Sequence, residues 1–230
     1  GINQTSGLVN DVRLSSRFNG PTFLSLNQAD GNLFVADGAN HVIRRVLPGD
    51  QGTVETLAGT EQQAGSQDGM LTQASFNNPQ GVALDRQGNL WVVESKNHTI
   101  RRINLDEGMV ETVAGQPGVA GSNDGVGSQA RFDSPVGIAF ETEPLALQLE
   151  RERQGDPPPP VTMVVADTGN GLIRRVHEDG TVETIVTGTS SPSAIRNLQG
   201  LSGLFQIQIT PAAFKNPTGV VVDSFGNIYV

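Results

Sequence analysis

The strongest constraint on the fold is a pattern that recurs along the chain, in which an apolar run ends in an acid and is followed a few residues later by Ile-Arg-Arg. It reads NLFVAD and VIRR within 32–45, NLWVVE and TIRR within 89–102, and MVVAD and LIRR within 163–175. A fourth copy begins as GNIYV at 226–230. Tandem repeats of this kind are typical of units that bury their apolar faces by stacking on their neighbours. The pattern therefore predicts a repeat architecture.

Each unit aligns on a phenylalanine that stands three residues before a proline. These phenylalanines are Phe18, Phe76, Phe132 and Phe214, at spacings of 58, 56 and 82 residues. In the second unit we expect four strands, at 81–85, 89–95, 99–104 and 109–114, joined by tight turns. Four antiparallel strands repeated at this spacing are typical of β-propeller blades. The sequence thus predicts an all-β chain with about three and a half four-stranded blades.

The alignment also predicts where the blades begin and end. Residues 1–16 are expected to add an outer strand that closes the ring. The blades are expected at 17–59, 74–115 and 130–188, with a fourth that begins within 213–230.

The third unit carries an insertion at 141–160, which holds the only helix candidate of the chain, at 145–153, and ends in four prolines. Because proline cannot pair in a β-ladder, we expect a solvated, partly disordered excursion. The alternative is an arm that docks into a partner with a proline-binding groove.

The second unit resembles the NHL repeat through its segments FNNPQGVALD, GNLWVVE, NHTIRRI and VETVAG, and the resemblance extends over roughly 17–230. It implies a six-bladed ring that another segment or chain would complete. It also implies a scaffold for protein or ligand binding without catalysis or a cofactor. The chain departs from the pattern at Phe23, where the other units have Gly81, Gly137 and Gly219. The innermost strand of the first blade is therefore expected to run differently.

An acid and an arginine recur seven residues apart in each of the three full units. The pairs are Asp37 with Arg44, Glu94 with Arg101, and Asp167 with Arg174. On neighbouring antiparallel strands this spacing lets the two side chains meet, so we expect a bidentate structural bridge in every blade. An arginine cluster that grips an anion is the alternative.

Metal ligation is not predicted from the histidines or from the aspartates. His41 and His98 share one repeat position, and equivalent positions on successive blades lie too far apart to converge on a metal. The loops AGSQDG and AGSNDG, at 64–69 and 120–125, could offer oxygens to calcium, but Ser-x-Asp-Gly more often closes a turn. Two sequons place candidate N-glycosylation sites at Asn3 and Asn97.

Composition narrows the function classes that remain. The net charge of −9 disfavours binding to nucleic acid, and the absence of cysteine excludes disulfides and thiolate chemistry. A metal-dependent hydrolase or lyase, with its site in the channel of a six-bladed ring, is the alternative to a binding scaffold. The lyase-type pattern would place a zinc histidine at four positions of this chain, and none of them is histidine: Thr22, Gln80, Val136 and Thr218. We expect a protein partner, no transmembrane segment, and an extracellular or cell-surface location.

Overall fold

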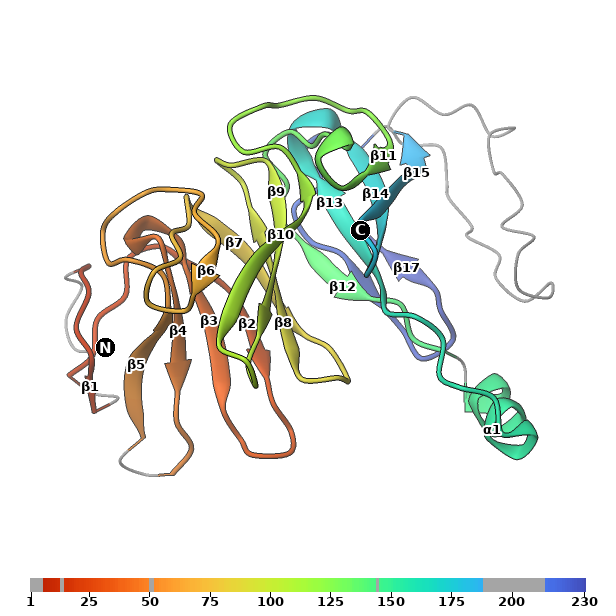
Figure 1. The fold of residues 1–230 in the computed structure, drawn as a ribbon, viewed down its shortest axis with the longest axis horizontal. Coiled ribbons are helices and arrows are strands. Elements are labelled where there is room, and N and C mark those ends of the chain that lie inside the picture. Colours follow the sequence, from red (N-terminus) through yellow and green to blue (C-terminus); the bar gives the residue numbers. More distant parts are fainter. Residues whose placement is uncertain (1–5, 13–14, 50–51, 144, 188–213) are drawn as a thin grey trace.

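The computed structural model describes residues 6–12, 15–49, 52–143, 145–187 and 214–230. They form three five-stranded antiparallel sheets and one two-stranded sheet, which follow one another across the molecule in chain order (Figure 1). The predicted all-β architecture of antiparallel blades is confirmed. The number of blades in a complete ring stays a prediction.

The strands of each sheet run from the outer edge to the inner edge in a constant order. In the first sheet they are β1 (Asp11–Val12), β5 (Thr53–Ala58), β4 (Val42–Val46), β3 (Leu33–Asp37) and β2 (Pro21–Leu26). In the second they are β6 (Gly69–Met70), β10 (Met109–Gly115), β9 (Thr99–Asn104), β8 (Asn89–Glu94) and β7 (Pro79–Leu84). In the third they are β11 (Gly125–Val126), β15 (Thr181–Thr187), β14 (Leu172–His177), β13 (Thr162–Asp167) and β12 (Ile138–Phe140). The fourth sheet pairs β16 (Val221–Val222) with β17 (Ile228–Tyr229).

A two-residue fifth strand, which the sequence analysis did not foresee in the second and third blades, lies at the outer edge of each five-stranded sheet. β6 precedes its own blade in the chain and pairs with the outermost strand β10, with Gly69 opposite Val110. β11 pairs with β15 in the same way. The N-terminal segment supplies β1, which pairs with β5 of the first sheet. The fifth strand is therefore a repeated part of this blade.

The apolar cores lie between consecutive sheets, because the strands of each blade present one face to each neighbour. Phe34 and Ile43 of the first blade pack with Phe76 and Leu90 of the second. Trp91 and Ile100 of the second pack with a cluster that includes Phe132 of the third. Phe76 and Phe132 are both completely buried. The repeated phenylalanine thus fills one core per pair of blades.

The expectation that the innermost strand of the first blade runs differently is wrong. β2 skips one residue against β3 between Pro21 and Leu24, and β7 skips one against β8 between Pro79 and Gly81. The same bulge therefore occurs in both strands, at equivalent positions. Phe23 occupies in β2 the position that Gly81 occupies in β7. The Phe23 side chain packs against the core between the first two blades.

Gly81 lies where two innermost strands approach closely. A Cβ atom at this position would stand 2.4 Å from the carbonyl oxygen of Val136 in the third blade. Backbone atoms cannot yield as a flexible side chain can, so Gly81→Ala is expected to lower the free energy of unfolding by about 1–3 kcal/mol. Denaturant unfolding would measure this loss, with Gln87→Ala in the exposed turn after β7 as the control. Equal stability of the two variants would contradict the close approach.

The helix candidate of the insertion is present as α1 (Leu145–Gln154), and none of its residues is buried. It is the only α-helix in the described part of the chain. Neither its length nor its apolar content would let it cross a bilayer, and no other described helix could do so.

Candidate functional site

Each of the three full blades holds an arginine whose side chain is completely buried. Arg44, Arg101 and Arg174 occupy the third strands β4, β9 and β14. Their Nη1 atoms lie 3.0, 3.1 and 2.9 Å from a carboxylate oxygen of the acid that ends the preceding strand. The register brings the pair together, because Glu94 stands opposite Thr99 and Arg101 lies two residues farther along the same face. All three predicted acid and arginine pairs are ion pairs in the structure.

The bidentate geometry expected of these pairs is wrong, because the second guanidinium nitrogen is engaged elsewhere. Nη2 of Arg101 donates to the Gln67 carbonyl at 2.9 Å and to Oδ1 of Asp68 at 2.7 Å. Nη2 of Arg174 binds the equivalent atoms of Asn123 and Asp124. In the first blade, Arg44 binds the Val9 carbonyl and the Asn10 side chain. Each arginine thus ties the middle of its sheet to the segment that carries the fifth strand.

We call this arrangement the arginine clamp: it consists of the buried arginine, its acid and the segment before the blade. The repeated phenylalanine packs against the arginine of each clamp. The guanidinium carbon of Arg101 lies 5.0 Å from the centre of the Phe76 ring. Arg44 and Arg174 lie at 4.9 and 5.2 Å from the rings of Phe18 and Phe132. At these separations a guanidinium is attracted to the face of an aromatic ring. The clamp therefore combines an ion pair with a cation–π contact.

An asparagine that was not predicted from the sequence completes every clamp. Nδ2 of Asn97 donates to Oε1 of Glu94 at 3.0 Å and to the Gly65 carbonyl at 2.7 Å. Asn40 and Asn170 make the equivalent two hydrogen bonds in the other blades. The constant spacing of three residues after each acid was the signal that could have identified them.

Asn97 is therefore not suited to carry a glycan, and that prediction is corrected. Its side chain is only 5 % exposed, and both hydrogens of Nδ2 are used inside the clamp. A sugar on this nitrogen would displace those hydrogen bonds. The other candidate, Asn3, lies outside the described residues.

The pKa values of two clamp acids, Glu94 and Asp167, are raised, because burial outweighs the contacts that stabilise the charged form. Burial raises the pKa of the Glu94 carboxyl, while Arg101 and hydrogen bonds from Asn77 and Thr99 act to lower it. Burial likewise raises the pKa of Asp167, against hydrogen bonds from Asn170 and Asp133 and the charge of Arg174. Both acids have their oxygens occupied by donors of their own blade. Because both side chains are also completely buried, they are directed to groups of their own blade and not to an external ligand.

The aspartates of the two similar loops are also occupied. Oδ1 of Asp68 accepts from Arg101 and from the Thr112 hydroxyl, and Oδ2 accepts from the Thr112 backbone nitrogen. Asp124 accepts from Arg174 and Thr184. In the described ranges, no group of three or more histidines, aspartates or glutamates is placed to hold a metal. The loops act as parts of the clamps.

The repeated histidines join consecutive blades. Nδ1 of His41 accepts a hydrogen bond from the backbone nitrogen of Asn78 at 3.1 Å, and Nδ1 of His98 accepts one from Ser134 at 3.0 Å. Both histidines have left-handed backbone angles, with φ of 60° and 59°, which the third unit supplies with Gly171. Each histidine thus combines a turn with a contact to the next blade.

We expect His98→Leu to lower the free energy of unfolding by about 2 kcal/mol, because leucine disfavours the left-handed conformation and cannot accept the Ser134 hydrogen bond. His98→Asn should lose less than half as much, since asparagine tolerates this conformation and its amide oxygen can accept. Urea unfolding compares the two variants. If both lost equally, the role assigned to the acceptor would be wrong.

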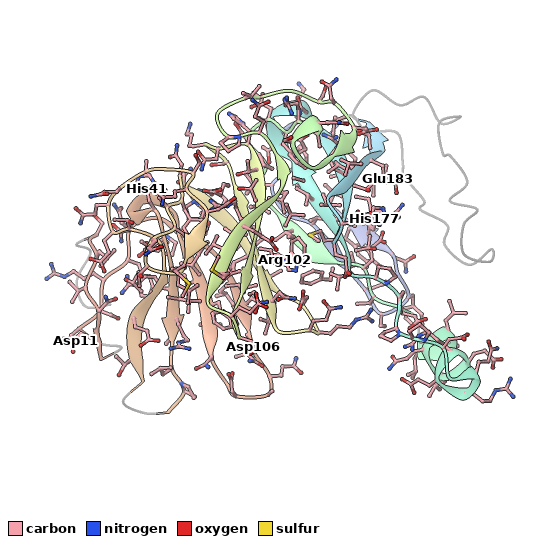
Figure 2. The ribbon with its side chains drawn as sticks, in the orientation of Figure 1. Asp11, His41, Arg102, Asp106, His177 and Glu183 are labelled. Atoms are coloured by element: carbon pink, nitrogen blue, oxygen red, sulfur yellow. The ribbon has the colours of Figure 1, made fainter. Side chains whose placement is uncertain are left out.

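The loops of the molecule gather on two opposite faces (Figures 1 and 2). The clamp face carries His41 and the short helices η1 (Gly38–Asn40), η2 (Gly127–Gln129) and η3 (Thr168–Asn170). The hairpin face carries the turns at 27–32, 85–89 and 105–108, the last of which contains Asp106. The insertion with α1 projects from the hairpin face.

The hairpin face is regular in the second blade and irregular in the third. Asp85 closes the turn after β7 by accepting hydrogen bonds from Gln87, Asn89 and the Trp91 indole. Asp223 closes the equivalent turn of the fourth unit in the same way. In the third blade the insertion at 141–160 replaces this short turn. It is the largest departure from the repeat among the described residues.

Comparison with known proteins finds an NHL repeat in the second blade. The NHL repeat model matches residues 76–103, which run from the core phenylalanine of the second blade through its clamp arginine. NHL repeat-containing protein 2 of Gallus gallus is 32 % identical over 122 residues, which cover 52 % of this chain and 16 % of that protein. This chain contains an NHL repeat. Protein SUPPRESSOR OF QUENCHING 1, chloroplastic, of Arabidopsis thaliana is 33 % identical over 137 residues, or 57 % of the NHL chain and 13 % of that protein. The NHL chain therefore spans less than a fifth of the length of these relatives.

Solved structures support the same fold. A protein of unknown function from Bacteroides thetaiotaomicron is 26 % identical, with a TM-score of 0.58 over 75 % of the NHL chain and 38 % of that protein. An auxiliary nutrient binding protein from Bacteroides ovatus has a TM-score of 0.59 over 93 % of this chain and 48 % of its own. At 15 % identity, the second likeness concerns the fold alone.

The channel positions considered for a zinc lyase have structural contacts in this NHL chain. The Thr22 hydroxyl donates to the Gln80 carbonyl at 2.7 Å, which links the innermost strands of the first two blades. The backbone nitrogen of Val136 donates to the Ala166 carbonyl at 3.0 Å within the third blade. The side chains of Gln80, Val136 and Thr218 do not supply the histidine ligands that such a site requires.

Proposed function

We propose that this NHL-type propeller is a non-catalytic scaffold that binds a protein or ligand partner through its loop faces. The observation that carries the proposal is the engagement of its repeated charged groups. The acid, arginine and asparagine of each clamp are bound to one another and to the backbone of their own blade. Groups used in this way stiffen the blade and leave recognition to the loops that differ between blades.

The neighbours of known structure support the proposal. Two of them are described as auxiliary nutrient binding proteins from Bacteroides species, with TM-scores of 0.57 and 0.59. A propeller presents loops around a rigid disc, and a binding function needs no catalytic group. The net charge of −9 favours a basic or neutral partner over an acidic one.

The exposed face of the first blade supports a second part of the proposal, that another segment or chain adds a further blade. Leu24 and Leu26 are 63 % and 54 % exposed on β2. Their equivalents Val82 and Leu84 pack against the first blade in the core between the two sheets. The free face therefore has the same apolar character as a face that a blade covers.

Photocrosslinking of the full-length protein that contains this chain to its binding partner tests the scaffold proposal. A photoreactive residue would replace Gln87 or Asp106 on the hairpin face, Gln116 on the clamp face, or Glu55 on an outer strand as the control. We expect a discrete adduct from at least one loop face and none from Glu55. Metal-dependent turnover of a small substrate without any loop-face adduct would overturn the proposal in favour of a hydrolase or lyase.

The extracellular or cell-surface location is also a proposal, and it now rests on Asn3 alone among the two sequons. A glycosidase-sensitive mass that is lost in Asn3→Gln would support it. An unmodified Asn3 in protein recovered from its native host would remove this support.

A further inference from the structure

The insertion ends in a row of four prolines, Pro157 to Pro160, on the hairpin face. Pro157, Pro158 and Pro160 are exposed, and Pro159 is half-buried. Each ring fixes its own φ and disfavours helical geometry in the residue before it, so the segment favours an extended polyproline II conformation. None of these four prolines lies in a helix or strand.

Contacts hold the segment in place at both ends. Before it, the backbone nitrogen of Asp156 donates to the Arg151 carbonyl at 3.1 Å, and Arg151 Nη1 donates to the Asp156 carbonyl at 3.2 Å. After it, Val161 and Glu178 exchange two hydrogen bonds, at 2.8 and 3.0 Å. A segment fixed in this way loses less conformational entropy when a partner binds.

A third contact comes from the neighbouring blade. Arg86, in the turn after β7, donates to the carbonyl of Pro159. At the other end of the insertion, the Thr142 hydroxyl donates to the Asp223 carbonyl in the fourth unit. The base of the insertion is thereby joined to the blades on both sides of it, while three proline rings stay accessible.

The helix that precedes the prolines has little support of its own. α1 has ten residues, a length at which an isolated helix is marginal in water. Leu145 and Leu149 are 66 % and 56 % exposed, and the Arg151 and Glu143 ion pair of 3.1 Å ties the helix to its base. Figure 1 shows α1 beyond the sheets. The insertion therefore has the form of a projecting arm, whereas the second and fourth units make the same connection with a short turn.

We propose that this arm is a docking element whose four prolines bind in an aromatic-lined polyproline II groove of a partner protein. The inference rests on the proposed scaffold function and names the class of partner. Residues 141–160 contain no aromatic side chain, so the arm can supply the proline ligand of such a complex but not its groove. The arm holds five acids and two arginines, a net charge of −3, which suits a groove with a neutral or basic rim.

Binding to isolated SH3, WW and EVH1 domains tests the proposal, because these domains represent three classes of aromatic-lined polyproline II groove. We expect at least one class to bind the intact protein saturably. The double variant Pro158→Ala/Pro160→Ala should weaken that binding at least tenfold without changing the unfolding midpoint. The control Pro117→Ala changes an exposed proline in the turn after β10 and should bind as the unchanged protein does.

Three results would overturn the inference. They are the absence of binding by every class at about 1 mM domain, equal affinity of the double variant, and binding of a free peptide of residues 154–162 without binding of the intact protein. If the loop-face crosslink of the previous section persisted in the double variant, the scaffold function would stand and only the assignment of the arm would fail.

Discussion

Arg101→Met is expected to lower the free energy of unfolding by about 3–5 kcal/mol, the largest loss that we predict for a polar residue of this chain. Methionine can fill much of the space but leaves the Glu94 carboxylate buried without its cation. It also leaves the carbonyls of Ser75 and Gln67 without a donor. Chemical denaturation followed by circular dichroism would measure the change in midpoint and slope.

The adjacent residue provides a matched control. Arg102 lies on the same strand with its side chain 32 % exposed, and it pairs with the exposed Glu111. A partly exposed ion pair contributes little, and the contact of Arg102 with the Trp91 ring at 5.7 Å adds to it, so Arg102→Met should cost about 1 kcal/mol. Similar losses in the two variants would show that the clamp contributes no more than a surface ion pair, and the assigned role would have to be abandoned.

Phe132→Ala is expected to lower the free energy of unfolding by about 3–5 kcal/mol as well. The ring is completely buried in the core between the second and third blades, and it lies 5.2 Å from the guanidinium carbon of Arg174. Truncation therefore leaves a cavity and also removes the ring that faces the clamp cation. Thermal unfolding is a suitable measurement, because a loss of this size should move the midpoint by several degrees.

Phe225→Ala is the corresponding control, since this phenylalanine is 73 % exposed in the turn of the fourth unit. Its midpoint should stay within experimental error of the unchanged protein. A Phe132→Ala protein that melts at the same temperature as this control would refute the core assignment.

The regular strands were predictable because their signals are local. In the second blade the expected strands at 89–95 and 99–104 match β8 and β9 to within one residue. The short apolar run at 90–93, the repeated Ile-Arg-Arg and the turn that Asp85 and Gly88 form identify these elements without any knowledge of distant contacts. The same local repetition placed Glu94 beside Arg101.

The remaining features depend on contacts between segments that are far apart in the chain. β6 has only two residues, which is too short to show a strand period, and it is recognised only by its pairing with β10. Asp68 reads as a turn residue in the sequence, yet its carboxylate binds Arg101 from a loop 33 residues away. The spacing of residues along the sequence does not predict such a distant partner. For this reason the bidentate bridge was predicted wrongly. The guanidinium of Arg101 instead donates to Glu94 with one nitrogen and to Gln67 and Asp68 with the other.

The position of the fifth strand has a consequence for how such a chain can change length during evolution. All five strands of the second sheet, from β6 to β10, come from one uninterrupted stretch, residues 69–115. The acid and the arginine of its clamp, Glu94 and Arg101, lie in that stretch. The second acid that binds this arginine is Asp68, directly before the stretch. A tandem duplication of about one period would therefore copy a whole blade together with its own internal lock, without any exchange of strands between distant repeats. Selection could then alter one copy's hairpin face, as in the third blade, while the copied framework stayed intact.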